Sequence, residues 1–117
     1  MALPTFFFQA SLPATRESLE PLAPLVVQVL SYTGYPESES RAIAKEIAKT
    51  AGTGLGSTVN GHMTITFEKD ETRLRISLNA PHLPETPPAK GLMDAVTVHK
   101  GKSGPVYRYE RRVPDAS

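Results

Sequence analysis

The chain has 117 residues, a length that suits one compact domain, so we expect a single domain over residues 1–117. Hydrophobic residues make up 39% and charged residues 21% of it, which is ordinary globular composition, and a formal net charge of +1 gives no electrostatic reason to expect nucleic acid as a partner. The absence of cysteine excludes disulfides and thiolate zinc sites, and His62, His82 and His99 lack the spacing of metal ligands, so no metal site is predicted.

The first segment, MALPTFFFQASLP, predicts a β-strand. It has no basic region followed by a long apolar one, and no apolar run in the chain approaches the roughly 20 residues of a membrane span, so we expect a cytoplasmic protein. Alternation places one set of side chains on one face of this strand: Phe6, Phe8, Ala10 and Leu12. Phe7 points to the other face, where we expect it to be exposed or covered by a partner.

An amphipathic helix is predicted in SLEPLAPLVVQVLSYTG. Its core face is formed by residues at helical spacing, namely Leu19, Leu22, Val26 and Val29. Gly34 ends the helix. Pro24 lacks an N–H and disturbs the first turn, so regular hydrogen bonding is expected to begin only after it.

A second helix is predicted from Pro36, which is tolerated in a first turn, to a stop at Gly52. Ile43, Ile47 and Ala51 recur at the spacing of one helical face and are expected to be buried. Glu46 and Thr50 are four residues apart. They are therefore neighbours along one edge of the buried stripe, at the border of core and solvent.

Four further strands follow, in two hairpins. MTITFE and RLRISL alternate apolar and polar residues around the turn KDET, and DAVTVHK and PVYRYERRV flank GKSG. The basic residues of YRYERR are expected on a solvated strand face. Four prolines between Pro81 and Gly91 predict a loop between the hairpins. We therefore expect an α+β two-layer sandwich, with helices on one face of a mostly antiparallel sheet.

The order of these elements, with the strings EIAKT, TRLRISLNA and GLMDAVTVHKGKSGPVYRYERRV, resembles the GHKL (histidine-kinase-like) ATPase fold. The nearest group is the small bacterial anti-sigma-factor serine kinases. That family has a helical E-x-x-x-N motif, whose Glu activates the accepting hydroxyl and whose Asn holds magnesium. The resemblance places Glu46 in the first role and Thr50 in the second. A hydroxyl is a poorer metal ligand than a carboxamide oxygen, and an ordinary helix-edge Glu46 paired with Lys49 is favoured over a catalytic base.

The family's next motif starts with an Asp that accepts a hydrogen bond from the adenine amino group and continues with glycines. Asn79 or Ala80 occupies the Asp position here, depending on register, and Pro81 follows in place of glycine. The adenine pocket is therefore expected to be degenerate. Gly52, Gly54 and Gly56 in AGTGLGST lie before the first hairpin, the wrong place for the family's glycine box, and favour a flexible connection over a phosphate cradle.

The resemblance implies a non-catalytic regulatory domain that binds a sigma factor or an antagonist protein in bacterial signalling and forms a homodimer. No cofactor is predicted for this function. One alternative is an ATP-dependent protein serine kinase with Glu46 as base, which would use ATP and Mg. Another is a homodimeric structural domain of unrelated role.

Overall fold

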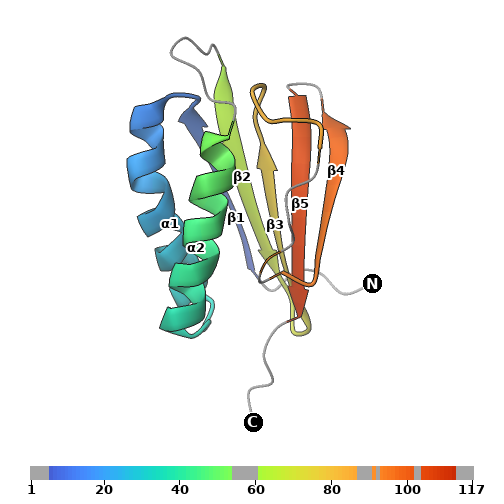
Figure 1. The fold of residues 1–117 in the computed structure, drawn as a ribbon. Helices are drawn as coiled ribbons and strands as arrows, with labels where there is room; N and C mark the ends of the chain where they lie inside the picture. The colour runs from blue at the N-terminus through green and yellow to red at the C-terminus, as the bar shows by residue number, and fades with distance from the viewer. Residues whose placement is uncertain (1–5, 54–60, 87–90, 92, 102–103, 113–117) are drawn as a thin grey trace.

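The computed structural model describes residues 6–53, 61–86, 91, 93–101 and 104–112. These residues form five strands and two α-helices, which lie on one face of the sheet (Figure 1). In chain order the elements are β1 (Phe6–Pro13), a 3-10 turn (Arg16–Ser18), α1 (Leu19–Tyr32), α2 (Glu37–Gly52), β2 (His62–Lys69), β3 (Arg73–Asn79), β4 (Ala95–Gly101) and β5 (Gly104–Arg112). The predicted α+β fold class is confirmed.

The sheet has the strand order β1-β2-β3-β5-β4, and every pair in it is antiparallel. β2 and β3 form one hairpin and β4 and β5 the other, while β1 and β4 lie at the two edges. Between β2 and β3, the Asp70 carboxylate accepts the backbone N–H groups of Thr72 and Arg73, each at 2.8 Å. These hydrogen bonds close the predicted KDET turn and hold the pKa of Asp70 below its ordinary value.

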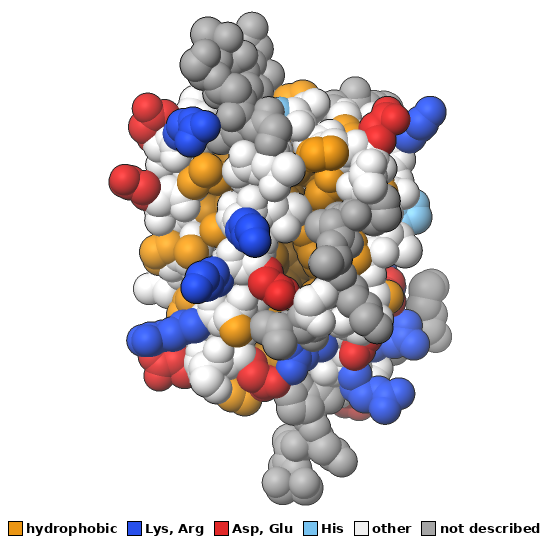
Figure 2. Space-filling view, in the orientation of Figure 1, with side chains coloured by type: hydrophobic (Ala, Val, Ile, Leu, Met, Phe, Trp, Pro, Cys, Tyr) orange, Lys and Arg blue, Asp and Glu red, His pale blue; other side chains and the backbone are white. Residues whose placement is uncertain are grey.

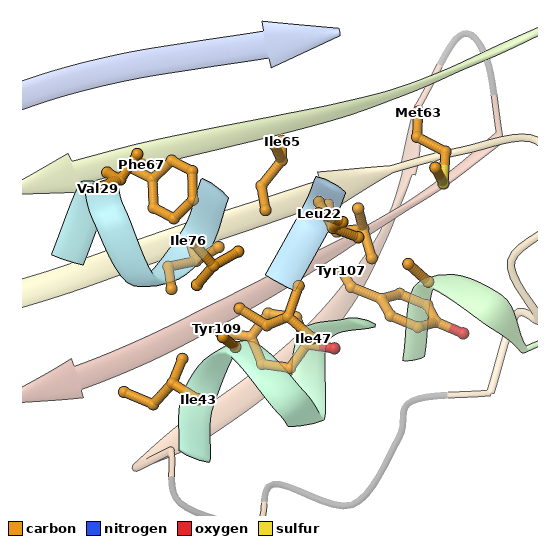
Figure 3. Close-up of a cluster of buried hydrophobic side chains, with 14 of the residues drawn as sticks. Leu22, Val29, Ile43, Ile47, Met63, Ile65, Phe67, Ile76, Tyr107 and Tyr109 are labelled. Carbon is orange, nitrogen blue, oxygen red and sulfur yellow. The ribbon is translucent and has the colours of Figure 1, made fainter. Parts of the chain in front are cut away.

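The pleat of the sheet separates an apolar face from a polar one. Register places Phe8 opposite Phe67 and Ile76 opposite Tyr109, so these side chains point the same way, toward the helices. The buried residues of β2, β3 and β5 belong to this face (Figure 3): Met63, Ile65, Phe67, Leu74, Ile76, Leu78, Tyr107 and Tyr109. The opposite face carries polar residues at the alternate positions: Thr64, Thr66, Glu68, Arg75, Ser77, Asn79, Arg108 and Glu110.

Each helix buries one stripe against the apolar face. α1 contributes Leu22, Val26, Val29 and Leu30, and α2 contributes Ile43, Ala44, Ile47 and Ala51. The two helices lie side by side on this face (Figure 1), and α2 contacts β5 through Glu39 and Arg111. Ala44 and Ala51 add little bulk, which lets α2 lie close to its neighbours.

The expectation that regular helix would begin only after Pro24 is wrong. α1 begins at Leu19, directly after the 3-10 turn, and Pro24 lies inside it. Proline removes one backbone donor from the helix interior, but Pro24 is exposed, and Leu22 and Val26 on either side of it are fully buried. Burial of these neighbours outweighs the lost hydrogen bond.

Ile47 tests the orientation of α2, because its side chain is only 1% exposed. Replacing it with alanine should reduce the free energy of unfolding by about 2 to 5 kcal/mol, since the cavity adds to the lost transfer energy. Urea denaturation of Ile47→Ala measures this change. Lys49→Ala, an exposed position on the same helix, is the control and should shift stability by less than about 0.5 kcal/mol. Equal urea midpoints of unfolding for the two variants would mean that Ile47 does not face the core.

Candidate functional site

The candidate site lies along the edge of α2 that faces β5. Glu46 and Thr50 are both half-buried on α2, one turn apart, as their spacing predicted. Beneath them, β5 directs Tyr107 and Tyr109 toward the helices, and Ile47 lies beside the Tyr109 ring (Figure 3). The structure thus brings together the two α2 residues that the resemblance singled out and adds two tyrosines to them.

The Tyr109 hydroxyl lies in a mainly apolar setting close to both α2 residues. Burial raises the pKa of Tyr109, the neighbouring Thr50 hydroxyl lowers it, and Tyr107 and Glu46 raise it further through their charges. Among the described residues, no group contacts this hydroxyl with ordinary hydrogen-bond geometry, so Thr50 is a close neighbour but a poor partner. Burial of the Tyr109 hydroxyl therefore lowers the stability of the fold.

Tyr107 holds the segment that follows β3. Its hydroxyl donates to the backbone carbonyl of Pro84 at 2.5 Å and lies 3.2 Å from that of Thr86. Burial raises the pKa of Tyr107, which keeps the hydroxyl protonated as a donor. These hydrogen bonds therefore attach the loop of residues 80–86 to β5.

His82 fastens the same segment to α2. Its Nε2 lies 2.7 Å from the carbonyl oxygen of Ala51, which as a carbonyl can only accept, so Nε2 carries the proton. This carbonyl is one of the last in α2, where the helix itself supplies no partner. His82 is thus a half-buried loop residue that contacts the end of a helix.

Glu46 lies against the backbone on the far side of the loop. A Cβ atom built on Gly91 would come 2.1 Å from the Glu46 Oε1 atom, and Gly91 has a φ of +54°. The positive φ favours glycine at this position, whereas the Glu46 carboxylate is the end of a flexible side chain and can move aside for a Cβ atom. The Glu46 carboxylate therefore packs against the protein's own chain just ahead of β4.

Asn79 and Ala80, the two positions that the resemblance offered for the family's Asp, differ in their surroundings. Asn79 ends β3 on the polar face, where its side-chain amide donates to the carbonyls of Gly104 and Pro105 at 3.1 and 3.0 Å. Ala80 is fully buried, continuing the alternation of Leu78 on the helix side. A methyl group cannot accept a hydrogen bond, so the residue on the site's side of the sheet lacks the family's acceptor.

The expectation of a solvated face for the basic residues of YRYERR is wrong in part. Arg108 and Arg112 point away from the core, but Arg111 reaches the helix side and pairs with Glu39 of α2. Tyr107, Tyr109 and His82 were missed as site residues. The alternation of tyrosine with charged residues in β5 was the available signal, since period-2 aromatic residues mark the buried face of a strand.

Three further expectations concern glycines, metals and membrane-spanning helices. Gly52 is the last residue of α2, whereas Gly54 and Gly56 lie outside the described residues. Within the described part of the chain, no group of three or more acidic or histidine side chains is placed to hold a metal ion. Among the same residues, no helix combines the length and apolar character needed to cross a membrane.

Comparison with known proteins adds no relative. No protein-family model matches the sequence, and no curated protein is significantly similar to it. The finding that stands is the α+β fold, a five-stranded antiparallel sheet with two helices in the described residues.

The two site tyrosines form a matched pair for mutagenesis. Tyr107→Phe should lower the free energy of unfolding by about 1 kcal/mol, because the carbonyls of Pro84 and Thr86 lose their donor. Tyr109→Phe should be neutral or stabilising, because it removes a buried hydroxyl without a partner of good geometry. Urea denaturation of both variants gives the comparison. A larger loss for Tyr109→Phe than for Tyr107→Phe would contradict this account of the site.

Proposed function

We propose that this protein is a GHKL-like regulatory domain without phosphotransfer activity, which acts by binding a protein partner in bacterial signalling. One observation carries the proposal. The α2 edge with Glu46 and Thr50, where the resemblance places magnesium and nucleotide, faces the protein's own loop, which Tyr107 and His82 fasten in place.

The element order supports the GHKL part of the proposal. A strand, two helices and two hairpins occur in the order that the resemblance implied, and the E-x-x-x-T string lies on the edge of the second helix. Glu46 and Thr50 lie together on that edge, as a motif that serves one site requires. This support is architectural and does not depend on any bound group.

Three features argue against nucleotide chemistry at this edge. Thr50 offers a hydroxyl where a carboxamide would bind magnesium better. Ala80 offers a methyl group where the adenine amino group would need an acceptor. Glu46 lies against Gly91, so a substrate hydroxyl could approach it only if the loop moved away. Binding of a protein is the function that remains, and the resemblance suggests a sigma factor or its antagonist.

The kinase alternative keeps Glu46 as the base and requires ATP and Mg. It needs the loop to break the contact of Pro84 with Tyr107 and that of His82 with Ala51 before nucleotide can enter. The structural-domain alternative needs no partner other than a second copy. Nucleotide binding separates the first alternative from the proposal, and the recovery of a specific partner separates the second.

Titration calorimetry with Mg·ATP tests the absence of a nucleotide site. We expect no measurable heat of binding for the wild type. Thr50→Asn, which restores the family's magnesium ligand, should also show none. The loop still lies at the site, and Ala80 still offers adenine no hydrogen-bond acceptor. A dissociation constant in the micromolar range for the wild type would favour the kinase. Binding gained only in Thr50→Asn would show that the missing carboxamide, and not the loop, had disabled the site.

Self-association through β1 is part of the proposal. Phe7 is 61% exposed, on the polar face of an edge strand, where a second subunit would remove its ring from water. An isologous dimer is the commonest way to cover such a surface. Phe8, on the helix side, contacts Phe67 with ring centroids 6.2 Å apart and is less available.

Light scattering coupled to size exclusion tests the dimer. The wild type should elute with twice the chain mass of 12.7 kDa, and Phe7→Asp should elute as a monomer because a charge would be buried in the interface. Tyr32→Asp is the control, since Tyr32 is an 81% exposed aromatic on α1, and it should stay dimeric. A monomeric wild type at tens of micromolar would remove the dimer from the proposal.

A further inference from the structure

The outer surface of the helical layer contains an apolar groove between α1 and α2. It encloses about 520 Å³, and its floor is formed by small apolar side chains from both helices, Ala23 and Val27 of α1 and Ala44 and Ala48 of α2. Figure 2 shows hydrophobic side chains in a broken line down this helical half of the face, with Lys and Arg side chains beside it. The groove lies on the side of α1 and α2 away from the sheet, and so is separate from the candidate site.

A basic stripe borders the groove. Arg41, Lys45 and Lys49 are exposed and recur every four residues along α2, so they line up on one edge of the helix. Arg41 pairs with Glu37 at 2.6 Å, whereas neither lysine forms an ion pair with a described residue. The charged residues that line the groove, Arg41 and Lys45, are both basic.

We infer that this groove binds an acidic amphipathic helix of the partner, an inference that rests on the proposed function. Two helices packed side by side leave a straight channel, into which the ridge of a third helix fits. Alanine on the floor allows the backbone of that helix to approach closely. The span from Arg41 to Ala48 is about two helical turns, enough for two or three apolar anchors at helical spacing.

The charge of the rim decides the chemistry of the occupant. Lys45 in the lining and Lys49 one turn further along α2 form no ion pair with a described residue, and beside an apolar floor they favour acidic side chains flanking an apolar stripe. The polar face of β2, β3 and β5 has polar side chains at its alternate positions in place of an apolar floor, and its two glutamates already lie near Arg75, 3.9 Å away for Glu68 and 3.5 Å for Glu110. The groove is therefore the better surface for an acidic helix.

A synthetic helix serves as the probe. A fluorescein-labelled peptide of about 16 residues, with leucine at helical spacing and glutamate on the other face, is titrated with the full chain and followed by anisotropy. Saturable binding is expected for the wild type. Lys45→Glu and, independently, Ala48→Asp should each weaken it about tenfold, by reversing a rim charge and by placing a carboxylate on the floor. Lys100→Glu, the same charge change at an exposed position of β4, should leave it unchanged.

Several results would overturn the inference. These are no binding to the wild type, equal binding of a peptide with the same composition in scrambled order, or equal binding to all three variants when circular dichroism shows them folded. Tight binding of phosphatidylserine vesicles that is lost in Lys45→Glu would instead make the groove a membrane surface. The Mg·ATP titration is independent of all these measurements, so failure of the groove and failure of the proposed function are distinguished.

Discussion

The attachment of α2 to β5 is the constraint on which the rest of the structure depends. Arg111 pairs with Glu39 near the start of the helix, Ile47 lies beside the Tyr109 ring in its middle, and His82 meets the Ala51 carbonyl at its end. These contacts fix α2 along its whole length and set which residues face the sheet. Because β5 pairs with both β3 and β4, they also connect the helical layer to the second hairpin.

This attachment determines how the loop after β3 is used. Ile47 of α2 lies beside the inward Tyr109 of β5, and the inward Tyr107 of the same strand also needs cover. Residues 80–86 provide part of it, and Tyr107 supplies the donor that the loop's own carbonyls require. A loop recruited to cover a core in this way cannot at the same time close over a nucleotide. The position of this loop and the cover of the core are thus one structural arrangement.

Sequence alone predicted the elements that depend on periodicity, and less of what depends on tertiary contacts. The alternation in β2 and β3 and the spacing of Ile43, Ile47 and Ala51 each placed side chains on the correct face. The start of α1 was predicted wrongly because the low helix propensity of Pro24 is a local property. The burial of Leu22 and Val26, which keeps this segment helical, depends on tertiary contacts. The face on which Asn79 lies depends on strand parity, which pairing with β5 fixes. The fastening of the loop by Tyr107 and His82 joins residues 21 to 31 positions apart, beyond any local pattern.

The two functional edges of α2 are geometrically independent. At 100° per residue, Ala44 and Ala48 lie about 160° around the helix from Glu46 and Thr50, with the core stripe between them. A partner helix in the groove would therefore contact α1 and the outer edge of α2 without displacing Gly91 or the loop residues 80–86. Release of that loop for phosphotransfer would instead break the Tyr107 and His82 contacts on the opposite edge. The proposed partner binding and the alternative of phosphotransfer thus make different demands on one helix, because only the second needs the Tyr107 and His82 contacts to break.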